Sequence, residues 1–349
     1  MMPNIDIKEM SQKQLAAWLE KHGIAAYRAS QILKWIYFRQ ADSFDAMTDL
    51  SKDHRKLLLS AFSIDRLEKV RVDSSRDGSK KYLFRLRDGC HIESVLITER
   101  DHYTLCISSQ IGCALGCRFC LTGKTGLLRN LTSGEIISQV RDIQKDLNEP
   151  QRLTNIVFMG MGEPLANYGS VLRAIDTLTD NTVGFGFAGR KITVSTAGLA
   201  DRLPDLGRDT AVSLAISLNA ADNKLRDWLM PINKKYPIEV LLDACRRYPL
   251  KPHRRITFEY VLINGINDSE KDAQRLAQLL RPVKAKINLI PFNAFEGVEF
   301  KRPDELMISR FQQILLQSNY TAIIRRSKGE DILAACGQLR ANHNASLNH

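Results

Sequence analysis

Apolar residues recur at helical spacing in the N-terminal part of the chain. Ser11 and Gln14 form a capping box ahead of such a pattern, which predicts a helix over 12–22. The same periodicity predicts a second helix over 28–39 and a third after Ser51. Together the three helices are expected to form a small packed module.

Between residues 69 and 98, apolar residues recur at every second position and no longer at helical spacing. Residues 69–73, 81–86 and 91–98 alternate or run apolar, and the turns at 77–78 and 88–89 between them are both Asp-Gly. Asp-Gly between two such runs is a strong hairpin signal. The sequence therefore predicts a β-meander.

Beyond residue 103, short apolar strands alternate with helices, which is typical of a parallel sheet. About six such units predict an α/β fold, a partial (β/α)6 barrel, whose functional side chains lie at the carboxyl ends of the strands. The predicted strands are 105–109, 155–159, 191–195, 213–217, 255–262 and 286–290, with helices from Ser133 and near 170–178.

These patterns divide the chain into four parts. Residues 1–68 form the helical module, 69–100 the β-meander linker, and 101–340 the partial barrel with its C-terminal segment. Residues 341–349 lack periodicity and are expected to be disordered. Residues 184–189 match G-x-G-x-x-G, but they precede a strand, so we expect a flexible loop and no dinucleotide site.

Three Cys residues follow the first predicted barrel strand with the spacing C-x3-C-x2-C, namely Cys113, Cys117 and Cys120. No second Cys or His pair lies nearby in the sequence to complete a four-ligand zinc site, so zinc fits poorly. A 4Fe-4S cluster is held by Cys thiolates, and with three of them one iron stays open for another ligand. The alternative is a set of buried or zinc-binding thiols.

This spacing, with Phe119 before the last Cys, resembles the radical S-adenosylmethionine (SAM) superfamily. The resemblance implies a 4Fe-4S cluster that cleaves SAM to a 5'-deoxyadenosyl radical. Gly162, Glu163 and the following Pro164 resemble the superfamily stretch that holds the methionine amino group. Further cofactor contacts are implied at strand ends, by Ser195, Ser217, Leu218, Asn219 and Asn293. Asn219 is a departure, because relatives usually have His there.

Cys336 lies where periodicity alone predicts a small core residue near a helix end. Residues 329–339 around it resemble the C-terminal motif of the RlmN and Cfr families of radical SAM RNA adenosine methyltransferases. The resemblance covers nearly the whole chain and implies that Cys336 is transiently methylated. It also implies that Cys106 closes a disulfide with Cys336 to release the product, and that Glu93 is a proton acceptor. Strand alternation alone would place Glu93 on the solvent side.

The resemblance also implies a substrate. RlmN-type enzymes methylate C2, and Cfr-type enzymes C8, of an adenosine in the peptidyl-transferase region of 23S rRNA; RlmN types also modify the tRNA adenosine 3' of the anticodon. Residues 162–165 and 290–293 resemble the RlmN branch. We therefore expect C2 methylation of both RNAs, with two SAM molecules consumed per methylation and a flavodoxin-like or ferredoxin-like electron donor.

The net charge of +11 favours a polyanionic partner such as RNA, which the helical module is expected to contact, although a generally basic solvated surface has the same composition. An odd count of seven Cys, no signal-peptide pattern and no apolar run of membrane-spanning length predict a cytoplasmic protein with no membrane association. We expect a monomer. Cys90 and Cys245 match nothing in the family pattern and are interpreted as structural.

A different class of protein, a non-enzymatic iron-sulfur RNA-binding or sensor protein, would share the basic surface. The joint presence of Cys106, Glu93 and Cys336 argues against that class, because binding alone needs none of them.

Overall fold

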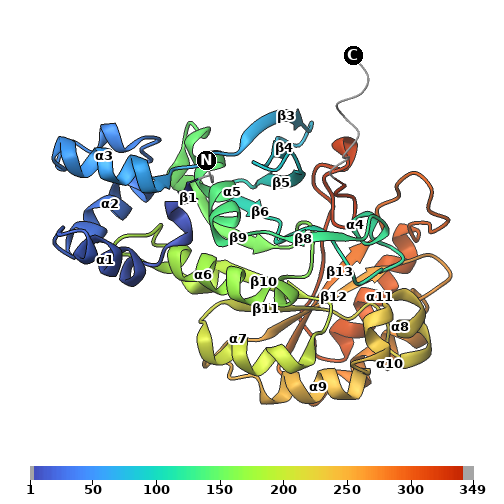
Figure 1. Ribbon diagram of the computed structural model, residues 1–349. Helices are drawn as coiled ribbons and strands as arrows, with labels where there is room; N and C mark the ends of the chain where they lie inside the picture. The colour runs from blue at the N-terminus through green and yellow to red at the C-terminus, as the bar shows by residue number, and fades with distance from the viewer. Residues whose placement is uncertain (1–3, 341–349) are drawn as a thin grey trace.

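A ten-stranded sheet organises the molecule, which is described here from a computed structural model over residues 4–340 (Figure 1). The strand order is β14-β13-β12-β11-β10-β9-β6-β5-β4-β3. Neighbours from β14 to β6 run parallel, and β5, β4 and β3 extend the sheet antiparallel. The parallel strands are β6 (Tyr103–Cys106), β9 (Leu153–Phe158), β10 (Ile192–Thr196), β11 (Ser213–Ser217), β12 (Ile256–Leu262), β13 (Ala285–Pro291) and β14 (Ala322–Ile324).

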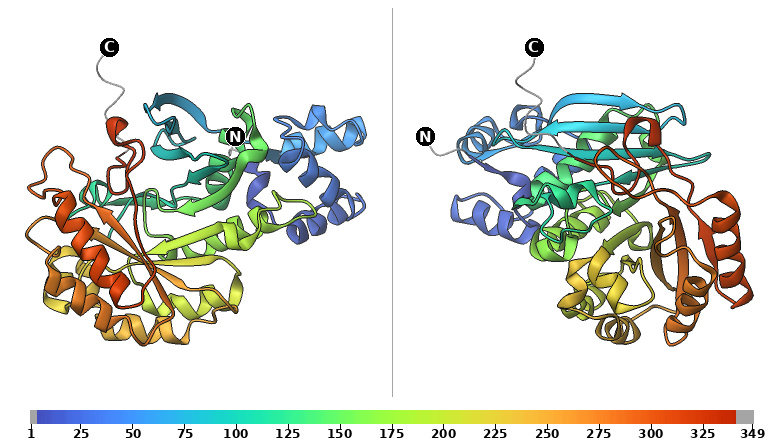
Figure 2. Two further views of the ribbon diagram at one scale, coloured as in Figure 1. Left: turned by 180° about the vertical axis from the view of Figure 1, so that it is seen from behind. Right: turned by 90° about the vertical axis from the view of Figure 1, so that its right-hand side faces the viewer.

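The parallel strands curve into an open barrel with helices on its outer side (Figures 1 and 2). These helices are α5 (Ser133–Lys145), α6 (Tyr168–Thr179), α7 (Leu203–Asp209), α8 (Asn223–Leu229), α9 (Ile238–Arg247), α10 (Glu270–Leu279) and α11 (Glu305–Gln317). The six predicted strands and the α/β class are confirmed. Strand β14 was not predicted, because three residues are too few to show a period.

The N-terminal helices and the meander strands form where the sequence pattern predicts them. The helices are α1 (Gln12–Lys21), α2 (Arg28–Tyr37) and α3 (Lys52–Ala61), and the meander consists of β3 (Glu68–Ser74), β4 (Lys80–Arg85) and β5 (His91–Thr98). The predicted capping box at Ser11 and Gln14 is present. Short elements complete the fold: β1 (Ile5–Asp6), β2 (Phe62–Ser63), β7 (Gln110–Gly112), α4 (Leu121–Lys124) and β8 (Leu127–Asn130).

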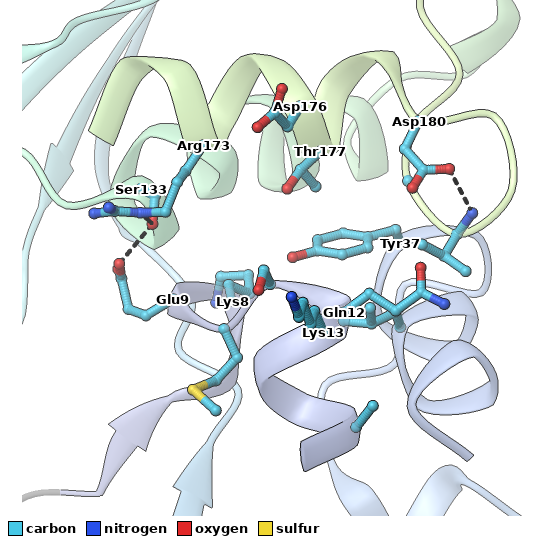
Figure 3. A pocket seen from close by; sticks show the side chains of 16 residues that line it. Lys8, Glu9, Gln12, Lys13, Tyr37, Ser133, Arg173, Asp176, Thr177 and Asp180 are labelled. Atoms are coloured by element: carbon cyan, nitrogen blue, oxygen red, sulfur yellow. Dashed lines mark hydrogen bonds between the residues drawn. The ribbon is translucent and has the colours of Figure 1, made fainter. Parts of the chain in front are cut away.

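The helical module is fixed to the barrel through α5. Glu9 accepts hydrogen bonds from Ser133 Oγ at 2.6 Å and from Gly134 N at 2.7 Å, and so pairs a carboxylate with the positive end of the α5 dipole (Figure 3). On the same helix, the buried Arg141 donates to the carbonyls of Ile36 and Ala41. The cavity that Figure 3 shows lies at this junction, between α1, α2 and α6.

The glycine loop at 184–189 precedes β10, as predicted, but it is not free of the fold. Phe185 N donates to Thr177 O and Phe187 N to Leu178 O, both on α6. These bonds correct the expectation of a flexible loop, because they tie its backbone to a helix. The expected disorder of 341–349 concerns residues outside the described range. Across residues 4–340, the helices are too short or too polar to cross a membrane.

Candidate active site

The three predicted cluster ligands line one cavity at the carboxyl ends of the strands. Cys113, Cys117 and Cys120 occupy the loop after β7, and their half-buried thiols face the same space as Glu163. Burial raises the pKa of Cys113 to about 12, and it raises the pKa of Cys117 as well, with a further contribution at both from the nearby Cys120. Three thiolates so close together are stabilised only if they bind positive charge, which the iron ions of an iron-sulfur cluster provide.

Across residues 4–340, no three His, Cys, Asp or Glu side chains are grouped as they would be around one metal ion. A 4Fe-4S cluster places its Cys ligands on different irons, so the three separated thiols of the loop fit a cluster. Gly112 shapes the start of this loop. Its φ is +76°, and a Cβ there would lie 1.8 Å from the carbonyl oxygen of Gly126.

Glu163 lies in the same cavity, after β9. Its carboxylate accepts hydrogen bonds from Ala197 N at 2.7 Å and Leu165 N at 3.0 Å. Burial raises its pKa to about 7 despite these bonds. No basic side chain pairs with it among the described residues, so a cationic amine in the cavity would supply the missing countercharge.

Gly162 sets the position of Glu163. Its φ is +98°, and a Cβ would lie 2.4 Å from Gln110 Cβ, while Gln110 Oε1 accepts from Glu163 N at 2.8 Å. The backbone here therefore packs directly on β7, and only Gly fits.

Gly162→Ala is expected to weaken SAM binding at least about tenfold, because displacing Glu163 by even an ångström disturbs the amine contact. Equilibrium dialysis of SAM against the reconstituted protein measures this. Gly89→Ala is the matched control, because Gly89 has a similar φ of +82° but open space around its Cβ position. Equal SAM affinity in the two variants would contradict the role of the 162–163 backbone.

The predicted strand-end residues divide into two groups. Ser195, Ser217, Asn219 and Asn293 line the cavity, whereas Leu218 does not; its backbone groups are bonded to Glu259 O and Arg226 Nε. Ser195 Oγ donates to Glu259 Oε2 at 3.0 Å. Asn293 Oδ1 accepts from Ser327 Oγ at 2.5 Å.

Asn219, the residue that departs from the pattern implied by the resemblance, has a structural task. Its φ is +60°, a left-handed conformation that Asn adopts more readily than most residues. Its side-chain oxygen accepts from Val261 N at 2.8 Å, and its amide contacts Met230 Sδ at 3.2 Å. The side chain therefore ties β11 to β12 while lining the cavity.

Three buried polar residues that sequence reasoning missed support this cavity. Arg226 donates to the carbonyls of Leu218 and Ala197 and to Asn233 Oδ1. Burial lowers the pKa of Arg226 to about 10. Asn267 bonds Asn219 O, and Glu259 lines the cavity beside Cys336.

The segment 329–340 brings Cys336 to the cluster loop. Leu121 N donates to Gly337 O at 2.7 Å, and Thr122 Oγ1 donates to Leu339 O at 2.6 Å. Cys336 is exposed to the cavity, in an irregular stretch. The periodicity-based expectation of a small core residue near a helix end is therefore wrong. Desolvation by the surrounding protein, with a further contribution from the charge of Glu259, raises the pKa of Cys336 to about 11.

Cys106 and Cys336 line a common cavity that continues into the barrel. Cys106 ends β6, and it belongs to the same small hydrophobic cluster as Ala334 and Leu339, which lie on either side of Cys336 in the sequence. A charge on Cys336 disfavours one on Cys106, whose pKa burial raises strongly. Both thiols are free and face the same space.

Glu93 is buried, which corrects the solvent-side placement from strand alternation. The reason is that the C-terminal segment covers this part of β5: Arg340 N donates to Glu93 Oε2 at 2.7 Å. Lys81 Nζ lies 3.5 Å from Glu93 Oε1. Burial raises the pKa of Glu93 even beside Lys81. Glu93 is absent from the lining of the two cavities, but it shares a face of β5 with Val95 and Ile97, which line the cavity of the two thiols.

A partial barrel with a three-Cys loop, a buried carboxylate for an amine and a cavity at the strand ends defines a radical SAM enzyme. Residues 107–277 match the Radical SAM superfamily, and residues 5–64 match the "Ribosomal RNA large subunit methyltransferase N-terminal domain". The structure of a radical SAM methyltransferase from Sphaerobacter thermophilus superposes with a TM-score of 0.92 at 45% identity, covering 97% of this chain and 100% of that one. A 4Fe-4S cluster and SAM are therefore the cofactors.

The chain belongs to the RlmN family. It is 58% identical over 337 residues to the dual-specificity RNA methyltransferase RlmN of Desulfosudis oleivorans, covering 97% of this chain and 91% of the relative. The RlmN of Geobacter sulfurreducens is 53% identical over 341 residues, covering 98% and 93%. The resemblance found in the sequence is thereby confirmed.

Proposed function

We propose that this protein methylates C2 of an adenosine in the peptidyl-transferase region of 23S rRNA and of the tRNA adenosine 3' of the anticodon. The observation that carries the proposal is the placement of two free thiols on one cavity beside the cluster loop. The relatives' name, dual-specificity RNA methyltransferase, supports RNA as the substrate class.

The chemistry explains why two thiols are needed. The adenine carbon is electron-poor and cannot attack the methyl group of SAM, so a direct polar transfer has no nucleophile. Cys336 is a nucleophile: as thiolate it displaces the methyl group from a first SAM, and a thioether forms. The bound cluster and a second SAM supply the radical chemistry that removes a hydrogen atom from this S-methyl group.

Cys336 then carries a methylene radical, which adds to the adenine carbon and gives a protein–RNA cross-link. To restore the aromatic ring, the adduct must lose one electron, which the bound cluster, left oxidised after SAM cleavage, would accept, and the ring proton. Cys106 lines the cavity, and Glu93 lies on β5 two residues before Val95, the strand partner of Cys106, so we assign the proton to Cys106 or to Glu93. Cys106 thiolate next attacks the Cys336 sulfur. The S–S bond forms as the S–C bond breaks, and the released carbon takes a proton to become the methyl group.

Nucleoside mass spectrometry tests the proposal. The reconstituted protein is incubated anaerobically with SAM, a reductant and either 23S rRNA or tRNA, and the digests are compared with 2-methyl- and 8-methyladenosine standards. We expect 2-methyladenosine in both RNAs. Production of 8-methyladenosine would overturn the C2 assignment, and SAM cleavage with no methyladenosine would overturn the substrate.

The other sequence-based expectations stay predictions. They are the domain boundaries at 68, 100 and 340, RNA contact by the helical module, a flavodoxin-like or ferredoxin-like donor, the monomeric state and the cytoplasmic location.

A further inference from the structure

Three cations stand together at the rim of the cavity that holds the reactive thiols. Arg325, Arg326 and Lys328 follow β14 directly, and all three line the same cavity as Cys106 and Cys336. Both Arg residues are exposed, and Lys328 is half-buried. Within residues 4–340, no carboxylate lies within ion-pair distance of these three side chains, and none of them forms a hydrogen bond.

The backbone that carries these cations is firmly held. Arg325 N donates to Leu289 O at 2.8 Å, which extends the pairing of β14 with β13. Ser327 Oγ donates to Asn293 Oδ1, and Gly329 N donates to Asp77 Oδ2 at 2.9 Å in the turn between β3 and β4. The segment therefore runs from the edge of the barrel to the meander (Figure 2), and these bonds fix the backbone positions from which the three side chains extend.

Exposed cations elsewhere on this chain commonly have a carboxylate beside them. Arg246 and Arg247 on α9, for example, both pair with Asp243. The nearby acidic residues are Glu99 and Glu259, which line the cavity, and the exposed Glu330, two residues after Lys328. None of them forms an ion pair with the three cations. Unpaired Arg and Lys side chains on a fixed backbone suit phosphate oxygens.

We propose that Arg326 and Lys328 bind the two phosphodiester groups that flank the target nucleotide, an inference that rests on the proposed function. A base that must reach Cys336 has to leave its stack, and its flanking phosphates then lie at the mouth of the cavity. Arg326 and Lys328 hold these phosphates and so fix the depth to which the adenine enters. Arg325, nearer the thiol and Glu259, is left unchanged in the test.

The test compares two double variants with equal loss of charge. Arg326→Gln with Lys328→Gln removes two of the three rim cations, and Arg246→Gln with Arg247→Gln removes two cations from the outer side of the barrel. Binding of a fluorescent anticodon stem-loop RNA to each reconstituted full-length protein is measured by anisotropy over a series of KCl concentrations. Methylation of the same RNA is measured by mass spectrometry.

For the rim variant we expect RNA affinity to fall roughly tenfold or more at low salt. We also expect the slope of log affinity against log salt to shrink by about 1.4, since each single-strand phosphate contact contributes about 0.7. Turnover at saturating RNA should fall as well, by roughly tenfold or more, because without the two contacts the adenine is no longer held at the depth that Cys336 requires. The α9 variant should keep the wild-type slope.

The outcomes separate the two proposals. Equal slopes for the rim and α9 variants would overturn the phosphate assignment while leaving methylation intact. A wild-type protein that binds the stem-loop with the expected rim dependence, but yields no methyladenosine, would overturn the proposed function and support the rim assignment. A wild-type protein that does not bind the RNA at all would overturn both.

Discussion

Cys336→Ala is expected to abolish RNA methylation, with a loss on the order of 10^4-fold or more, as when a covalent nucleophile is removed. The reason is chemical: without this thiolate the methyl group has no acceptor in the cavity, and the adenine carbon cannot take its place. Nucleoside mass spectrometry measures the loss. RNA binding should persist, because the rim cations and the rest of the surface are unchanged.

Cys245→Ala is the matched control for thiol loss. Cys245 is buried on α9 in the main hydrophobic core, away from the cavity of the two reactive thiols. This variant should methylate RNA at close to the wild-type rate. Normal methylation by the Cys336 variant would refute the covalent route, whatever the control does.

Cys106→Ala is expected to trap the protein on its RNA. Addition to the adenine can still proceed through Cys336, but no second thiol remains to attack its sulfur and release the product. The cross-link should therefore accumulate to about one RNA per active site, and multiple turnover should cease. Denaturing gels with labelled RNA detect it as a shifted band that resists heat and detergent.

The double variant Cys106→Ala with Cys336→Ala should show no shifted band, since the attachment point is missing. A band that survives in the double variant would place the cross-link on another residue. Free methylated RNA released by the single variant at the normal rate would remove Cys106 from the release step.

The local sequence pattern was sufficient to predict most elements of the fold. The capping box of α1, the Asp-Gly turns of the meander and the six longer barrel strands each carry their signal within a few residues, so they could be predicted. The short β14 and the loop conformations could not, because packing against β13 and α6 determines them.

For the candidate site too, local motifs identified only part of the residues. Motif spacing located Cys113, Cys117, Cys120 and Glu163, which share one cavity. It could not find Arg226 or Glu259, because neither belongs to a local motif, and each matters only through contacts with strands far away in the sequence. The burial of Glu93 likewise depends on the C-terminal segment that covers it.

The two hydrogen bonds between the cluster loop and the Cys336 segment have a consequence for the protein in air. Leu121 follows the last cluster ligand directly, and its amide holds Gly337, the neighbour of Cys336. Oxidative loss of the iron would free the loop that anchors this segment. Under the proposed mechanism, Cys336 would then lose its position together with the metal, so both SAM-dependent steps would fail together, and the damaged enzyme would not consume SAM without forming product.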